Sequence, residues 1–123
     1  MPYVSAVALS LALRSIADNI PDMVGYWDAA RVLRFANRPY EAWYGSGVVG
    51  LRRDEMFGAP EGDPGEAAFA AALRGEPQHV EYDLINRLGE RRMTWIHYVP
   101  DRQDNQVVGL FVLVSDISEL KLA

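Results

Sequence analysis

Apolar side chains run almost without interruption from Val107 to Val114, where only Gly109 lacks one. Valine and phenylalanine are prominent in this run, which favours a β-strand. Because successive strand residues point to opposite faces, Phe111 and Leu113 would lie on one side and their neighbours on the other. Both sides are apolar, and burying one large apolar side chain is worth roughly 1.5–3 kcal/mol. We therefore predict the central strand of a sheet that is covered on both faces.

Two further strands precede this central strand. Residues 78–87 alternate between apolar and polar side chains, a turn follows at 88–90, and residues 91–99 form the next strand. Residues 100–105 make a second turn into the central strand. Three strands joined by short turns predict an antiparallel meander.

The first half of the chain predicts a hairpin followed by helices. Residues 23–27 and 32–36 are short strands that would join the meander in one sheet of about five strands, an α+β fold. Three segments then follow, namely a helix over 38–44 capped by Asn37, a loop over 48–65 with a helical turn near 53–57, and an alanine-rich helix over 66–75.

The chain begins with a helix over residues 5–17 that is apolar around most of its circumference. Its large apolar residues are Val7, Leu9, Leu11, Leu13 and Ile16. A helix that is apolar on more than one side requires two partners. We predict that one side packs on the otherwise bare face of the sheet and that the other forms a dimer interface with a second copy of the chain.

The composition excludes several classes of site. The chain has 123 residues, a net charge of −5 and no cysteine, which excludes disulfides, thiolate metal sites and cysteine nucleophiles. The arginines are scattered, so no basic stripe indicates a nucleic-acid partner. The chain contains no run of about 20 apolar residues, which a membrane-spanning helix would need. It also lacks the cationic segment that precedes the apolar part of a signal peptide. We expect a single cytoplasmic domain without membrane contact.

Four short motifs occur in order along the chain. They are Asp28 to Asn37 before a predicted helix, Ala72 to Pro77 before a strand, Val99 to Arg102 before the last turn, and Val108 to Ser118 at the end. Together with the order of elements, they resemble the PAS domain, a sensor module of bacterial signal-transduction proteins. The resemblance covers residues 18–119.

The resemblance implies a five-stranded antiparallel sheet with a helical clasp on one face and the N-terminal helix on the other. It divides the chain into a flanking dimerisation helix at 1–17, a PAS domain at 18–118 and the start of an output linker helix at 119–123. It further implies a non-catalytic sensory module of a histidine kinase, a cyclic-di-GMP enzyme or a transcription regulator. Such a module binds a small ligand, forms a homodimer through its N-terminal helix and passes the signal to a following output domain.

The signal is expected to leave the domain at Asp116, Ile117 and Ser118, which resemble the Asp-Ile-Thr signature of the family. Asp116 would cap the departing helix and couple movements of the sheet to it.

Aromatic and apolar residues of the clasp and the sheet are candidates to line a ligand cavity, because rigid rings with polar tips suit a small, partly apolar ligand. The candidates are Tyr26, Phe35, Tyr40, Trp43, Tyr44, Phe69, Leu73, Tyr82, Trp95, His97 and Phe111. The alternative is that these side chains simply fill the core. A cavity of about 300 Å3 or more would support sensing, and its absence would support a scaffolding domain without a ligand.

Two other chemistries remain open on the strand over 78–87. His79, Glu81 and Asp83 alternate there and could ligate a metal together, although a solvated polar face is the favoured interpretation. Asp83 could instead act as general base of a small cone-shaped α+β enzyme, provided that it faces an apolar pocket. The alternation points Tyr82 inward and both carboxylates outward, which argues against the enzyme.

The resemblance also restricts the cofactors. Light sensors of this family form a flavin adduct with a cysteine, which the chain lacks. Its haem sensors generally carry a histidine on the helix that corresponds to residues 66–75, where there is none. A flavin adduct is therefore excluded and haem is disfavoured, while a non-covalently bound flavin or a small organic ligand remains open.

Overall fold

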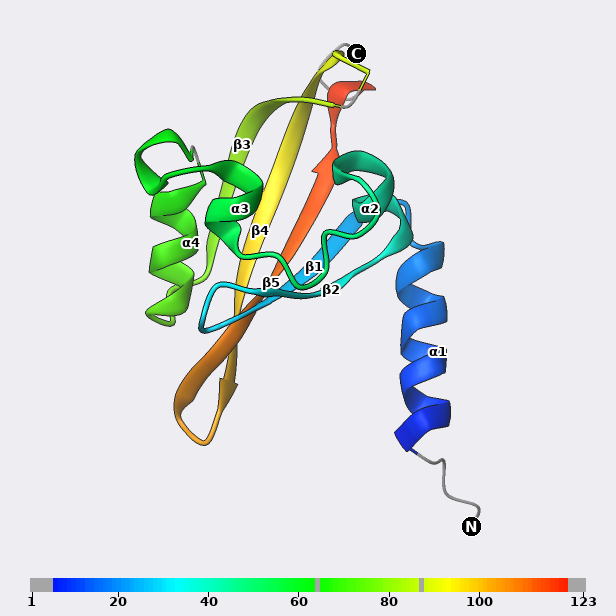
Figure 1. Cartoon of the computed structure of the whole chain (residues 1–123), viewed down its shortest axis with the longest axis vertical. Helices are drawn as coiled ribbons and strands as arrows, with labels where there is room; N and C mark the ends of the chain where they lie inside the picture. The colour runs from blue at the N-terminus through cyan, green and yellow to red at the C-terminus, as the bar shows by residue number, and fades with distance from the viewer. Residues whose placement is uncertain (1–5, 64, 87, 120–123) are drawn as a thin grey trace.

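The computed structural model describes residues 6–63, 65–86 and 88–119. Along the chain lie α1 (Ala6–Asn19), β1 (Met23–Asp28), β2 (Leu33–Ala36), α2 (Arg38–Tyr44), α3 (Arg53–Phe57), the 3-10 helix η1 (Pro60–Gly62), α4 (Glu66–Leu73), β3 (Gln78–Ile85), β4 (Arg91–Gln103) and β5 (Gln106–Asp116). The five strands form one antiparallel sheet in the order β2-β1-β5-β4-β3, so β5 lies at its centre (Figure 1). The predicted α+β fold with a central C-terminal strand is confirmed.

One face of the sheet is covered by the clasp, which we define as α2, α3, η1 and α4 (Figure 1). Leu110, Val112 and Val114 of β5 are buried under it and belong to the hydrophobic core. Trp27 of β1 packs edge-on against Phe69 of α4, with ring centroids 5.6 Å apart. The core therefore lies between the sheet and the clasp.

The opposite face, called the open face below, is left partly uncovered by the described residues of the chain. Phe111 of β5 and Val99 of β4 are each 40% exposed. α1 lies beside the β2 end of the sheet, next to α2, rather than across this face (Figure 1). The N-terminal helix thus reaches this face only at the β2 side, where Arg14 lies 5.1 Å from the Phe35 ring centroid. The expectation that it buries the whole second face of β5 is not met, because Phe111 stays 40% exposed.

Asn37, the buried N-cap of α2, explains why α1 stays at this end of the sheet. Its Nδ2 donates to the carbonyl oxygens of Ala17 at 2.7 Å and Asp22 at 2.9 Å, while its Oδ1 accepts from the Tyr40 backbone N–H at 3.1 Å. The backbone N–H of Arg38 also donates to the Asp18 carboxylate at 2.8 Å. These bonds fix the last turns of α1 to the start of α2.

Within the described ranges, no helix combines the length and the apolar character that crossing a membrane requires.

The last hairpin differs from the prediction. β4 extends to Gln103 instead of ending at residue 99, and the turn contains only Asp104 and Asn105, with φ of 51° and 62°. Asp and Asn tolerate this left-handed conformation, which a tight two-residue hairpin requires. Pro100 is accommodated because β3 pairs with β4 only as far as Tyr98, so beyond it β4 is an edge on that side.

Candidate functional site

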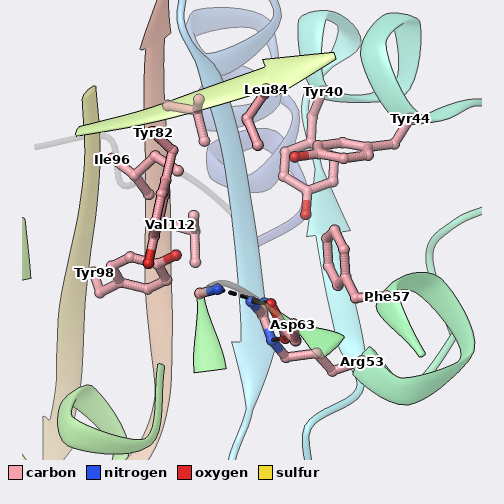
Figure 2. A pocket seen from close by; sticks show the side chains of 12 residues that line it. Tyr40, Tyr44, Arg53, Phe57, Asp63, Tyr82, Leu84, Ile96, Tyr98 and Val112 are labelled. Carbon is pink, nitrogen blue, oxygen red and sulfur yellow. Dashed lines mark hydrogen bonds and ion pairs between the residues drawn. The ribbon is translucent and has the colours of Figure 1, made fainter. Parts of the chain in front are cut away.

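A small cavity with a volume of about 70 Å3 lies between the clasp and the sheet. It is lined by apolar, tyrosine and charged side chains from both layers (Figure 2). They belong to Tyr40, Tyr44, Arg53, Phe57, Asp63, Tyr82, Leu84, Ile96, Tyr98, Val112 and Val114, with Gly65 completing the wall. The volume is far below the roughly 300 Å3 of a typical ligand pocket and accommodates a few water molecules.

A buried ion pair forms one end of the cavity. The side chains of Arg53 and Asp63 are only 8% and 4% exposed, and Arg53 Nε donates to Asp63 Oδ2 at 2.7 Å. The guanidinium lies 4.2 Å from the Phe69 ring centroid and 4.6 Å from that of Phe57. Asp63 Oδ1 also accepts from the backbone N–H of Gly65 at 2.9 Å. Each of the two buried charges is thus compensated by the other.

The sequence analysis missed this pair. Arg53 and Asp63 lie in a segment interpreted as a loop, where charged residues are usually exposed. The one available signal is the predicted helical turn at 53–57, which the structure confirms as α3 and which brings Arg53 toward the sheet.

Three tyrosines near the ion pair are held in the neutral form. Burial raises the pKa of Tyr44 to about 12, with Arg53 acting in the opposite direction. Burial likewise raises the pKa of Tyr98 and of Tyr82. In the described part of the chain, the hydroxyls of Tyr44 and Tyr98 have no hydrogen-bond partner. They are therefore available to a molecule inside the cavity.

We predict that the protein loses stability in alkali because these tyrosines resist ionisation. A folded-state pKa above the unfolded value of about 10 stabilises the fold below pH 10, and this contribution is lost as the pH rises through the folded value. Tyr26 behaves like Tyr44, because burial and its hydrogen bond to Asp101 raise the pKa of Tyr26 to about 12. For both residues the loss of stability therefore falls between about pH 10 and pH 12. Phenolate absorbance and circular dichroism should therefore change together; gradual ionisation near pH 10 with native dichroism would contradict this.

The structure places only three of the eleven predicted ligand-binding residues around the cavity, namely Tyr40, Tyr44 and Tyr82. Phe69 is fully buried in the core, and Leu73 packs against it. Trp43 lines a separate groove of about 340 Å3 that it shares with Leu88 and Asp116. These three residues belong to the clasp but lie outside the cavity.

The other five predicted cavity residues lie on the open face, so their assignment to the cavity is corrected. They are Tyr26, Phe35, Trp95, His97 and Phe111, and the sheet separates them from the clasp. The reason is strand alternation, since their neighbours Trp27, Ile96, Leu110 and Val112 point into the core.

The open face has its own aromatic contacts. The Tyr26 hydroxyl donates to Asp101 at 2.7 Å, and its ring packs edge-on against Phe111 with centroids 4.8 Å apart. Further along, His79 lies directly opposite His97 and stacks on Trp95 with centroids 5.7 Å apart. Trp95 Nε1 donates to His97 Nε2. His97 thus contacts Trp95 and not the interior cavity.

The enzyme alternative loses its general base. Asp83 faces solvent on β3 and pairs with the exposed Arg91 at 3.3 Å, while Tyr82 points into the cavity. Glu81 is exposed on the same side as Asp83. Among the described residues, no three His, Cys, Asp or Glu side chains are grouped so that they could hold a metal ion. Neither Glu81 nor Asp83 therefore faces the cavity.

Comparison with known families agrees with this arrangement of sheet and clasp. A model described as the PAS fold matches residues 17–122. The chain belongs to the PAS fold family. No curated protein matched the sequence.

Solved PAS-like structures show the same fold at low sequence identity. VqmA of Vibrio cholerae has a TM-score of 0.76 and 17% identity, over 96% of this chain and 53% of that one. An RNA-binding light-oxygen-voltage receptor has a TM-score of 0.73 and 19% identity, over 98% and 37% of the two chains. A PAS domain from Colwellia psychrerythraea has a TM-score of 0.68 and 19% identity, over 89% and 98%. This PAS domain thus spans only part of the first two proteins.

The C-terminal end of the PAS domain is tied to β4. Asp116 accepts from Arg92 Nε at 2.7 Å and from the backbone N–H of Ser118 at 3.0 Å. The backbone N–H of Met93 donates to the Ser118 hydroxyl at 3.0 Å, and Ile117 N–H donates to the Met93 carbonyl at 2.9 Å. Burial alone would raise the pKa of Asp116, but the donors Arg92 and Ser118 hold it below its usual value.

Proposed function

We propose that this PAS domain is the sensory and dimerisation module of a longer signal-transduction protein, such as a histidine kinase, a cyclic-di-GMP enzyme or a transcription regulator. The carrying observation is the apolar surface shared by α1 and the open face. A groove of about 630 Å3 lies there, lined by Leu11, Leu13, Arg14, Ala17, Val24, Phe35 and Phe111. Apolar surface of this kind on a soluble domain marks an interaction site.

A second copy of the chain is the proposed occupant of this groove. Leu11, Leu13 and Ile16 are 66%, 57% and 61% exposed, while the open face beside them carries the half-exposed Phe111. Helix and sheet face thus offer apolar surface side by side, as a self-complementary two-fold interface requires. The predicted interface residues Val7 and Leu9 belong to α1, but their side chains lie outside the described part of the chain. VqmA, a protein of the same fold, forms a dimer.

Signal transfer is proposed to pass through Asp116, Ile117 and Ser118. Their hydrogen bonds join the last residues of β5 to Arg92 and Met93 of β4, so a shift of one strand is transmitted to the start of the next segment. We propose that the domain occupies residues 18–118, with α1 as the flanking helix and a linker helix starting at 119. An output domain would follow it, and we propose that the whole protein works in the cytoplasm.

Sensing by the interior cavity is restricted by its size. A volume of about 70 Å3 has room only for a ligand of few atoms. Ligand-free scaffolding is therefore the second candidate function. The unpartnered hydroxyls of Tyr44 and Tyr98 favour a bound molecule. Native mass spectrometry of the purified protein, compared with a denatured sample, discriminates the two: a retained small molecule supports sensing, and bare protein supports scaffolding.

We predict that Leu11→Asp weakens self-association by about 100-fold or more, because each dimer would bury two charges in place of two leucine side chains. Light scattering coupled to size-exclusion chromatography would then report the mass of a single chain. Leu88→Asp is the matched control, since Leu88 is 83% exposed on the β3–β4 turn and should leave the dimer intact. A wild-type chain that is already monomeric at high concentration would overturn the dimerisation proposal.

A further inference from the structure

We infer that the interior cavity recognises a small, electrically neutral molecule whose hydrogen-bonding group accepts from the Tyr98 hydroxyl, beside Gly65 in the cavity wall. This inference rests on the proposed sensory function, because it names the ligand class of the same cavity. It depends on three observations, which are the charge balance of the cavity, the unpartnered Tyr98 hydroxyl beside Gly65 and the rings that form the walls.

The charges in the cavity are already balanced. Arg53 is engaged by Asp63 through Nε at 2.7 Å and Nη2 at 3.3 Å, and Asp63 also accepts from the Gly65 backbone. The nearby tyrosines stay neutral, because burial raises the pKa of Tyr44 and Tyr98. An anionic ligand would have to displace Asp63 from Arg53, and a cationic ligand would leave its own charge without a free carboxylate. Because burying an unpaired charge is strongly unfavourable, the cavity favours a neutral molecule.

Gly65 lets two polar groups of the cavity wall approach its backbone closely. A Cβ built at this position would lie 2.7 Å from the Tyr98 hydroxyl oxygen and 2.9 Å from Arg53 Nη2, closer than such atoms can pack. Gly65 has φ of −91° and ψ of −1°, a conformation open to residues with a side chain, so the backbone itself does not require glycine. An alanine at this position would therefore displace the Tyr98 hydroxyl or the Arg53 guanidinium from its place in the wall.

Tyr98 supplies the free hydrogen-bonding group. The residue is only 3% exposed, and its hydroxyl faces the cavity without a partner among the described residues. A hydroxyl in such surroundings normally has a hydrogen-bond partner, either a protein group or ordered water. A neutral ligand with a carbonyl or amide group would accept a hydrogen bond from this hydroxyl.

The remaining walls suit a compact apolar body. Tyr82, Ile96 and Tyr98 lie on the sheet side and face Tyr44 and Phe57 on the clasp side (Figure 2). The volume of about 70 Å3 restricts this body to a few non-hydrogen atoms unless side chains move. A ligand of about four such atoms binds no tighter than roughly 40 µM, so the probe experiment requires high concentrations.

The test uses acetamide and acetate, which have the same shape and differ in charge. Each is titrated into 15N-labelled protein at constant ionic strength, and backbone NMR shifts of Gly65 and Tyr98 are followed. We expect saturable shifts with acetamide at millimolar concentrations and at least tenfold weaker binding of acetate. Gly65→Ala should abolish the acetamide shifts, whereas Gly62→Ala should not, because no atom lies within 4 Å of a Cβ at Gly62.

Tyr98→Phe is the second variant, since it removes the hydroxyl and keeps the ring. This variant should bind acetamide about tenfold more weakly while keeping the native NMR spectrum. The test therefore stands even if Gly65→Ala fails to fold. Acetate binding as tightly as acetamide, or no saturable shift with either probe, would overturn the inference. Neither result touches the proposed dimerisation and relay, which the Leu11→Asp experiment tests independently.

Discussion

Replacing Arg53 with methionine is expected to lower the free energy of unfolding by about 3–5 kcal/mol, because it leaves Asp63 buried without its counter-charge. The two side chains are 8% and 4% exposed, so water compensates neither of them. Methionine keeps a long apolar side chain against the rings of Phe57 and Phe69, which limits the loss of packing. Urea denaturation at pH 7 measures the effect.

Two further variants separate the charge effect from packing. Arg52→Met removes an adjacent arginine that is 62% exposed and pairs with Asp54 on the surface, and it should change stability by no more than about 1 kcal/mol. Adding Asp63→Leu to Arg53→Met removes both charges and should recover most of the loss, as replacing a whole buried pair often does. A loss below about 1 kcal/mol for Arg53→Met alone would show that the pair is not buried in solution.

The position of β5 in the fold could be predicted because its signal is local. The apolar run from Val107 to Val114 requires burial, and the sheet places that strand between β1 and β4. The order of strands and helices followed from the same kind of periodic pattern. What the pattern could not predict is that α1 leaves part of the second face exposed. An apolar face has the same sequence whether its cover is a helix of its own chain or another chain.

The Arg53–Asp63 pair lies beyond such reasoning for a different reason. The two residues are ten positions apart in an irregular segment, and neither periodicity nor local propensity requires them to meet. Their burial results from the way α3 and η1 fold back over the sheet, which is a tertiary effect. Charged residues in a glycine-rich segment are usually solvated, so the sequence alone favoured the wrong interpretation.

The aromatic residues were only partly predictable, although the alternation rule was sufficient for some of them. The rule places Phe111 and its neighbour Leu110 on opposite faces of the sheet, and the structure confirms this. Grouping Phe111 with the clasp residues Tyr40 and Tyr44 as one cavity overlooked this consequence. For Trp95 the sequence was ambiguous, because the side chains of both its neighbours on β4 could lie on either face of the sheet. Only the pairing of β4 with β3 and β5 resolves it.

Gly109, the one residue without an apolar side chain in the central run, is expected to be indispensable to the sheet. Gly109→Ala should lower the free energy of unfolding by about 3 kcal/mol, the upper part of the usual range for overpacking. The added Cβ would overlap the Trp27 carbonyl oxygen and lie 2.5 Å from the Tyr26 hydroxyl. The first of these atoms is backbone and cannot rotate away, so β1 would have to move from β5. Thermal and urea denaturation would both report the loss.

Two comparisons show which of these contacts dominates. Gly62→Ala, where a Cβ meets no atom within 4 Å, should leave stability nearly unchanged. Combining Gly109→Ala with Tyr26→Phe removes the hydroxyl that would be crowded and its 2.7 Å bond to Asp101, but it leaves the Trp27 carbonyl in place. The double variant should therefore remain as unstable as Gly109→Ala. Recovery of wild-type stability would instead show that Gly109 is needed to accommodate the Tyr26–Asp101 hydrogen bond. The close approach of the β1 backbone to β5 would then not be the reason for glycine.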